Sequence, residues 1–169
     1  MKKILVIGCP GSGKSTFSRA LSQAAGGLPV IHLDCLHWKP DGTNVPKEEF
    51  LERLCRDLEG EQWICDGNYA STMELRLQRC DTVFFLDLPA EVCLAGIHSR
   101  RGQPRSDMPW KGADEDGDPE FVEFIRHFAA DCRPEILRLL ERYPEKEIHI
   151  FTHRSEGQRF LEAFAQERI

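Results

Sequence analysis

The sequence has no long apolar run. Its longest uncharged apolar runs are strand-sized, such as Ile4 to Ile7, whereas a membrane helix needs about 20 residues. Hydrophobic residues make up 41% and charged residues 30% of the 169 positions, which is ordinary globular composition and excludes a disordered chain. The basic start at Lys2 and Lys3 leads into an apolar run that already ends at Gly8. We therefore expect no secretion signal, no membrane contact and one cytoplasmic domain over residues 1–169.

A surplus of positive charge is also missing. There are 22 basic and 28 acidic side chains, which gives a formal net charge of −6. Proteins dedicated to nucleic-acid binding usually carry a basic surplus, because neutralisation of phosphates supplies most of their affinity. We expect no direct nucleic-acid partner, and only a local basic patch stays open. The oligomeric state is not readable from the sequence.

Paired cysteines are absent as well. No two cysteines form a C-x-x-C pair, the total of 7 is odd, and most lie inside apolar segments. This pattern favours reduced thiols that pack as small hydrophobic side chains in a cytosolic protein. A zinc site is the minor alternative. The cysteines are Cys9, Cys35, Cys55, Cys65, Cys80, Cys93 and Cys132.

Short apolar runs alternate with longer amphipathic stretches. Strand patterns cover residues 3–7, 29–33, 62–65, 82–86 and 147–151, and helical spacing covers 14–25, 48–58, 90–101 and 155–166. Strands that alternate with helices pair in parallel through right-handed crossovers. The sequence therefore predicts an α/β fold, a three-layer α/β/α P-loop NTPase architecture with a five-stranded parallel sheet.

One segment interrupts this alternation. Residues 102–119 contain three glycines, three prolines and the acidic run 114–116, with almost no apolar periodicity. A loop of this length inside a compact domain is more often functional than not, so we expect a lid-like insertion. The aromatic stripe that follows, from Phe121 to Phe128, is interpreted as core packing, and Pro134 is expected to kink or restart its helix.

Residues Gly8 to Ser15 read GCPGSGKS and match the phosphate-binding pattern G-x-x-x-x-G-K-[ST]. The motif follows the first predicted strand and opens a helix, so successive backbone N–H groups can surround phosphates at the positive end of the helix dipole. Lys14 is placed to reach the β- and γ-phosphates, and the Ser15 hydroxyl is a ligand for Mg²⁺. The predicted nucleotide-binding residues are Gly8, Cys9, Pro10, Gly11, Ser12, Gly13, Lys14, Ser15 and Thr16.

Carboxylates follow three predicted strands. Asp34 and Asp66 come just after the second and third strands, and Asp87 comes at the end of the fourth. Ligands of open parallel sheets bind at the carboxyl ends of the strands. We assign Asp66, with Ser15, to Mg²⁺, and Asp34 to accepting a hydrogen bond or proton from a phosphate acceptor, while Asp87 is a weaker candidate. His32, Asp34 and His37 also suggest zinc, but no fourth ligand has a recognisable spacing.

Several segments together resemble the adenylate-kinase-like topology modulation proteins. They are Gly8–Thr16, Leu33–Pro40 (LDCLHWKP), Trp63–Tyr69 (WICDGNY), Asp81–Pro89, Arg105–Pro109, Arg133–Leu137 and Tyr143–Pro144. The resemblance covers nearly the whole chain, and its D-G-N-Y and L-H-W-K-P motifs are more specific than the phosphate loop. The family's name implies an effect on DNA supercoiling, although no residue pattern here supports direct DNA binding.

The resemblance also implies roles for individual residues. Asp66–Tyr69 (DGNY) stands where adenylate kinases have D-G-F-P-R, so Asp66 takes the magnesium-associated place and the phosphate-gripping arginine is missing. We take Arg76 as its replacement. Arg100 corresponds to a phosphate-gripping arginine at the base of the lid. Gly96 stands where the family commonly has an arginine that stacks on adenine.

The acceptor side of the predicted site departs from adenylate kinases. Asp34, His37 and Trp38 replace a helical pocket for a nucleoside monophosphate, and we add Asn68 and Tyr69 as acceptor-binding residues. These departures favour an acceptor other than AMP. The role of Asp34 is similar to that of the corresponding acids in shikimate- and gluconate-type kinases.

The resulting prediction is a kinase that transfers the γ-phosphate of Mg-ATP to a small molecule. Lys14, Arg100, Arg101 and Arg105 supply positive charge around the transferred group, and closure of the lid excludes water. The loop 152–155 borders the base and lacks a guanine-reading N-K-x-D sequence, which favours ATP. The alternatives are a regulatory ATPase or switch, linked indirectly to DNA topology, and, with less weight, a DNA-binding regulator.

Overall fold

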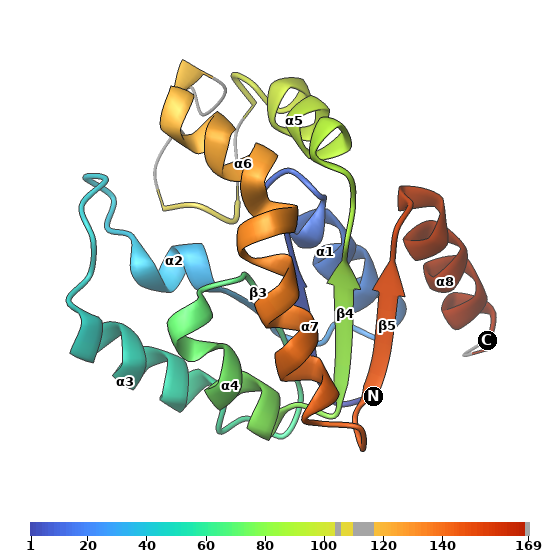
Figure 1. The fold of residues 1–169 in the computed structure, drawn as a ribbon. Coiled ribbons are helices and arrows are strands. Elements are labelled where there is room, and N and C mark those ends of the chain that lie inside the picture. Colours follow the sequence, from blue (N-terminus) through green and yellow to red (C-terminus); the bar gives the residue numbers. More distant parts are fainter. Residues whose placement is uncertain (104–105, 110–116, 168–169) are drawn as a thin grey trace.

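The computed structural model describes residues 1–103, 106–109 and 117–167 of the chain. Five strands form one sheet in the order β2-β3-β1-β4-β5 (Figure 1), and each neighbouring pair is parallel. The strands are β1 Lys3–Gly8, β2 Val30–His32, β3 Trp63–Asp66, β4 Thr82–Leu86 and β5 Glu147–Phe151. Helices lie on both faces of the sheet, so the predicted three-layer α/β/α fold is confirmed.

The helices agree with the predicted alternation, with two additions. They are α1 Lys14–Ala24, α2 Leu33–His37, α3 Lys47–Asp57, α4 Ala70–Arg79, α5 Ala90–Ser99, α6 Pro119–Asp131, α7 Arg133–Glu141 and α8 Arg154–Gln166. The sequence did not predict α2 or α4. Leu33, which was expected to end the second strand, is instead the first residue of α2. The break between α6 and α7 confirms the effect expected of Pro134. Pro134 lies in the first turn of α7, where a backbone N–H would have no partner within the helix.

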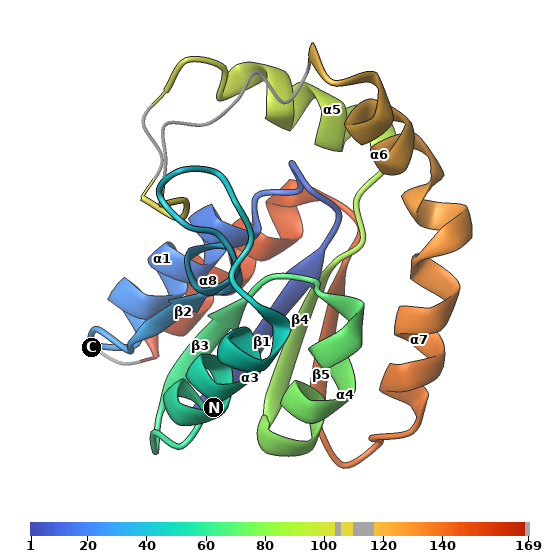
Figure 2. The ribbon, with the colours of Figure 1, turned by 90° about the vertical axis from the view of Figure 1, so that its left-hand side faces the viewer.

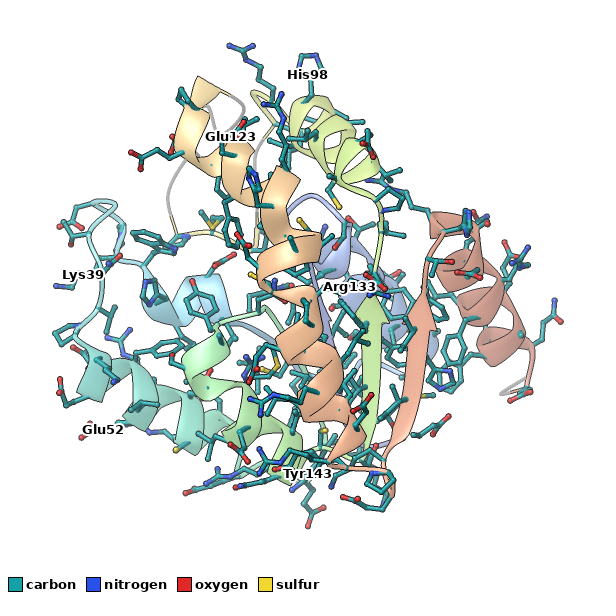
Figure 3. The ribbon with its side chains drawn as sticks, viewed as in Figure 1. Lys39, Glu52, His98, Glu123, Arg133 and Tyr143 are labelled. Atoms are coloured by element: carbon teal, nitrogen blue, oxygen red, sulfur yellow. The ribbon has the colours of Figure 1, made fainter. Side chains whose placement is uncertain are left out.

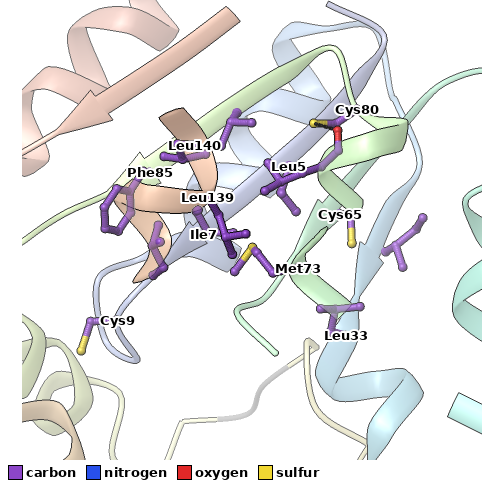
Figure 4. Close-up of a cluster of buried hydrophobic side chains, with 14 of the residues drawn as sticks. Leu5, Ile7, Cys9, Leu33, Cys65, Met73, Cys80, Phe85, Leu139 and Leu140 are labelled. Atoms are coloured by element: carbon purple, nitrogen blue, oxygen red, sulfur yellow. Dashed lines mark hydrogen bonds between the residues drawn. The ribbon is translucent and has the colours of Figure 1, made fainter. Parts of the chain in front are cut away.

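The two faces of the sheet bury separate apolar clusters, because successive strand residues point to opposite sides. Ile4 and Val6 of β1 face α1 and α8, where Phe17 is buried with them. Leu5 and Ile7 face the other side, with residues of α4 and α7 (Figure 4). All seven cysteines are free, and Cys9, Cys65, Cys80 and Cys93 are buried, as the expectation of reduced thiols requires.

The carboxyl ends of the parallel strands meet at one edge of the sheet. The phosphate loop after β1, α2 after β2 and residues 67–69 after β3 therefore lie next to one another. Figure 2 shows α5 and the start of α6 above this edge. The thiol of Cys35 in α2 contacts the carbonyl of Ser106 at 3.9 Å, so residues 106–109 lie over α2. In the described part of the chain, no helix has both the length and the apolar character of a membrane span.

Candidate active site

The phosphate loop adopts a backbone shape that glycine favours. Gly11 and Gly13 have φ values of +80° and +98°, in the left-handed region that other residues rarely adopt. Helix α1 starts directly after Gly13, and no side chain caps its N-terminus. Since the first N–H groups of a helix have no partners within it, they can bind an anion. The loop thus has the geometry of a phosphate cradle.

The outer side of the phosphate loop packs backbone to backbone on α5. A Cβ on Gly11 would lie 2.1 Å from the carbonyl oxygen of Cys93, and a Cβ on Gly96 would lie 2.1 Å from the carbonyl oxygen of Gly11. Both positions therefore require glycine, because any side chain would force the loop and α5 apart. Gly11 stands at an unspecified position of the pattern G-x-x-x-x-G-K-[ST] and Gly96 belongs to no motif, so the packing of the loop on α5 explains both glycines.

Lys14 and Cys9 differ in how they contribute to the loop. The ammonium of Lys14 donates to the carbonyl of Cys9 at 3.1 Å and lies in the cavity described below. The side chain of Cys9 is 2% exposed and points into the core. A hydrogen bond with Cys93 and burial both raise the pKa of the Cys9 thiol. Cys9 therefore offers a nucleotide only its backbone.

A cavity of about 650 Å³ lies at the carboxyl ends of the strands. Its lining includes Pro10, Gly11 and Gly13 of the loop but not Gly8, Cys9 or Ser12. Nine further predicted site residues line it, namely Lys14, Ser15, Thr16, Asp34, Trp38, Asp66, Asn68, Tyr69 and Arg100. The cavity also includes residues that the sequence analysis did not select: Arg19, Gly67, Gln103, Ser106, Asp107, Met108, Asp118, Phe121 and Phe124. The predicted Arg105 lies outside the described residues, and Arg101 is exposed at the end of α5.

Asp66 enters this cavity from the end of β3 and is 4% exposed. Its Oδ2 is 2.8 Å from Nδ1 of His32 on the neighbouring strand β2. His32 therefore holds Asp66, which argues against a zinc role for His32. Among the described residues, no group of three or more His, Cys, Asp or Glu side chains is arranged to hold a metal ion.

Asp34 reaches the cavity from α2 and is bonded to Tyr69. The phenol of Tyr69 donates to Oδ1 of Asp34 at 2.7 Å. Burial and the nearby Asp34 carboxylate raise the pKa of Tyr69, so the phenol stays protonated as a donor. Tyr69 has φ +37° at the start of α4, an unusual backbone conformation for a bulky residue. This turn directs its side chain toward α2.

The structure corrects the role expected for His37. Its ring packs edge-on against Trp38 and Phe50, with centroids 4.9 and 5.5 Å away, and against Tyr69 at 4.9 Å. His37 is not among the residues that line the cavity. It supports the aromatic residues behind the acceptor side, while its neighbour Trp38 reaches the cavity. The sequence pattern did not distinguish these adjacent residues.

Arg76 is also corrected, because its guanidinium does not face the cavity. It is 0% exposed and donates to the carbonyl oxygens of Gly67, at 2.7 Å, of Asn68, and of Tyr69, at 3.1 Å. Burial lowers the pKa of Arg76. Arg76 therefore shapes the turn between β3 and α4 and cannot replace the missing phosphate-gripping arginine.

Asn68 joins this turn to the phosphate loop. Its Oδ1 accepts from the N–H of Gly8 at 2.9 Å, and its Nδ2 donates to the Gly8 carbonyl at 2.5 Å. The side chain lines the cavity, but its amide positions the first residue of the loop. Contact between Asn68 and an acceptor stays a prediction.

Asp87 has a partner that the sequence did not suggest. Nε of Arg133, labelled on α7 in Figure 3, donates to both carboxylate oxygens of Asp87 at 3.0 and 2.8 Å. Asp87 does not line the cavity, and its carboxylate is already paired with Arg133, which gives no support to the magnesium role considered for it. The pair instead ties the end of β4 to α7.

The aromatic stripe of α6 serves two purposes. Phe128 and Ile125 are buried in the core, as expected, whereas Phe121 and Phe124 line the cavity and Phe124 is 44% exposed. The Asp118 side chain caps α6 by accepting from the N–H groups of Glu120 and Phe121. The large exposed fraction of Phe124 fits an apolar wall for a ligand.

A second, smaller cavity of about 240 Å³ adjoins the phosphate loop between α1 and α8. Its walls are mostly apolar, and they include Phe17, Leu88 and Phe151. Polar groups come from the segment after β5, where the sequence analysis expected the base to lie, and from α8. They are His153, Arg154 and Gln158.

Comparisons with known proteins show the fold. No family model matches the chain, and no curated protein matches it. Among solved structures, a shikimate kinase from Acinetobacter baumannii in complex with shikimate is 17% identical with a TM-score of 0.62, covering 100% of this chain and 96% of its own. A gluconokinase from Sinorhizobium meliloti 1021 is 18% identical with a TM-score of 0.56, covering 98% and 92%. At this identity the likeness is one of fold: a five-stranded parallel sheet with helices on both faces.

Proposed function

We propose that the protein is an ATP-dependent kinase that phosphorylates a small molecule and acts as one domain. The lid-like insertion expected at residues 102–119 stays a prediction, because residues 104–105 and 110–116 lie outside the described part of the chain. One observation carries the proposal: a single cavity contains both the phosphate loop and the carboxylate of Asp34. A phosphoryl donor and an acceptor hydroxyl can therefore meet within one cavity. The fold shared with a shikimate kinase and a gluconokinase supports this reaction class.

The donor side fits Mg-ATP. The uncapped start of α1 and the ammonium of Lys14 suit the phosphates, and the Ser15 hydroxyl and Asp66 carboxylate offer the oxygen ligands that Mg²⁺ prefers. When bound, Mg²⁺ neutralises charge on the phosphates. Arg100 adds a second cation from the end of α5. The smaller cavity beside the loop is assigned to the nucleobase, because it is mostly apolar with polar groups at one side.

The acceptor side fits a hydroxyl compound better than a nucleoside monophosphate. Asp34 accepts the proton of the attacking hydroxyl, and the hydrogen bond from Tyr69 fixes the orientation of its carboxylate. Trp38, Phe121 and Phe124 form apolar walls. The burial of Arg76 strengthens the case against AMP, since this side lacks the cation that the sequence analysis assigned to an acceptor phosphate.

The resemblance to topology modulation proteins belongs to this proposal only as a possible physiological setting. The net charge of −6 gives no support to direct DNA binding. An effect on DNA topology would then be an indirect consequence of phosphorylation of a small molecule.

The test is transfer of label from γ-labelled ATP with Mg²⁺ to a panel of nucleosides, nucleotides, sugars and hydroxy acids. We expect label in one class of hydroxyl compound and none in that class with the Lys14→Ala variant as control. Label released only as free phosphate across the panel would contradict a kinase and favour a regulatory ATPase. No turnover and no ATP binding would contradict both.

A further inference from the structure

Arg154 connects three segments that are far apart in the chain. It is the first residue of α8, directly after the loop that follows β5. Its Nη2 donates to the carbonyl oxygen of Gly11 in the phosphate loop at 3.0 Å and to that of Val92 in α5 at 3.3 Å. Gly11 and Arg154 are 143 positions apart. The proposed kinase function uses neither of these contacts.

On the side that faces α5, this guanidinium leaves no room for a side chain at position 96. A Cβ on Gly96 would lie 2.6 Å from Nη2 of Arg154 and 2.1 Å from the Gly11 carbonyl oxygen. We call the place where Gly11, Cys93, Gly96 and Arg154 meet the loop–α5 seam. The glycine at position 96 admits the guanidinium from α8 and the loop carbonyl at the same time.

The contact fixes the peptide group between Gly11 and Ser12 at both ends. Its carbonyl accepts from Arg154, and its N–H donates to the carbonyl of Cys9 at 3.1 Å. Peptide groups beside glycine rotate easily because no Cβ restricts them. Rotation of this group would turn a carbonyl, with its partial negative charge, toward the phosphates. Arg154 opposes this rotation by holding the carbonyl on the outer side of the loop.

We infer that Arg154 is a positioning residue for the phosphate loop: through the Gly11 carbonyl it keeps the loop in the conformation that binds a triphosphate. The inference rests on the proposed nucleotide binding. In this role Arg154 affects phosphate binding indirectly, by holding the loop, although the same residue also lines the smaller cavity proposed for the base.

Comparing a ligand that has a base with one that lacks it distinguishes this role from a direct contact with the base. Binding of ATP and of inorganic triphosphate, each with Mg²⁺, is measured by calorimetry for the wild-type protein, Arg154→Ala and Arg154→Lys. We expect Arg154→Ala to weaken both ligands by a similar factor of about 10, because a charged donor to the loop is lost. Arg154→Lys keeps one donor, and we expect it to restore part of the affinity. Gly96→Ala, which crowds the same seam, should also weaken both ligands.

Arg159, exposed on the same helix, supplies the matched control: Arg159→Ala should bind both ligands like the wild type. Thermal unfolding of each variant shows whether the fold is kept. If Arg154→Ala does not fold, the binding measurements with Arg154→Lys provide the test. Weaker ATP binding with unchanged triphosphate binding would overturn the inference in favour of a base contact. Unchanged binding of both would also overturn it. If the wild type bound neither ligand, the proposed nucleotide binding itself would fail, and the inference with it.

Discussion

The two sides of the cavity are built in different ways. The proposed donor side consists mainly of one continuous stretch, Gly8 to Ser15, whose backbone forms the phosphate cradle, and Asp66 and Arg100 join it from β3 and the end of α5. The acceptor side combines side chains from α2, the turn after β3, residues 106–109 and the start of α6. A short motif can specify a backbone shape, but residues brought together from four segments depend on how the whole chain packs.

The phosphate loop also depends on residues that are distant in the sequence and contact its outer surface. Gly96 and Arg154 support the loop from α5 and α8, and Asn68 bonds Gly8 from the turn after β3. The groups proposed to bind phosphate in the loop are thus close together in the sequence, whereas the residues of the acceptor side come from separate segments.

Loss of the Lys14 ammonium is expected to have the largest effect on the donor side. Lys14→Ala should lower the rate of phosphoryl transfer by a factor on the order of 10² to 10³ or more, as for other lost transition-state donors, and weaken ATP binding. Rates with labelled ATP and calorimetry of ATP binding check both effects. Unchanged turnover would contradict the assignment of the phosphate loop.

Asp34→Asn sharpens the contrast from the acceptor side. We expect transfer to fall by about 10²-fold or more, the usual contribution of a general base, while ATP affinity stays close to the wild-type value. Tyr69→Phe, which removes the hydrogen bond to Asp34, should lower transfer less. If Asp34→Asn lost ATP binding to the same degree as transfer, Asp34 would belong to the magnesium site instead.

Arg76→Leu tests whether the turn after β3 depends on one buried cation. The change leaves the carbonyl groups of Gly67, Asn68 and Tyr69 without their guanidinium donor. With about 1–3 kcal/mol for each unsatisfied buried group, we expect the free energy of unfolding to fall by about 3 kcal/mol or more. Urea denaturation measures this loss, with Arg79→Leu on the same helix as a milder control. A stable Arg76→Leu protein with impaired acceptor binding would restore the role that the sequence suggested.

The smallest expected effect is on stability, and it comes from Glu156 in the first turn of α8, the helix that also carries Arg154. Hydrogen bonds from the backbone N–H groups of His153 and Thr152 lower the pKa of Glu156. A lowered pKa in the folded state means that the stabilisation is complete above the unfolded value of about 4.3 and is lost as the pH falls through the folded value. Glu156→Gln should therefore be less stable than the wild type at pH 7. The difference in thermal unfolding midpoint should shrink as the pH falls below the unfolded value and should disappear below the folded pKa, and a difference that does not change with pH would contradict this explanation.

The strands and the donor loop were predictable because periodicity and one motif specify them. The positions of Asp34 and Asp66 were predictable too, since residues after parallel strands meet at one edge. Helix α2 was missed because its five residues are too few to show a helical period. Helix α4 is longer, and the analysis did not recognise it.

The errors at the site have a common physical cause. Asp87 was selected for its place at the end of a strand, and Arg76 and His37 were selected through the comparison with adenylate kinases. Burial of Arg76, ring packing of His37 and a partner of Asp87 that is 46 positions away are not visible in either pattern. Phe124 was missed for the converse reason: one apolar stripe on α6 covers both core and cavity. Periodicity identifies an apolar face but not what lies opposite it.

The sheet order has a consequence for the time at which the site forms during translation. Strand β1 is made early, but its neighbours β3 and β4 begin only at Trp63 and Thr82, and Arg154 follows Gly11 by 143 residues. At synthesis rates of about 5–20 residues per second, β1 waits several seconds for its partners, and the Gly11 carbonyl waits longer for its donor. The phosphate loop thus leaves the ribosome before the strands that flank β1, and it acquires its contact with Arg154 only when α8 has been made.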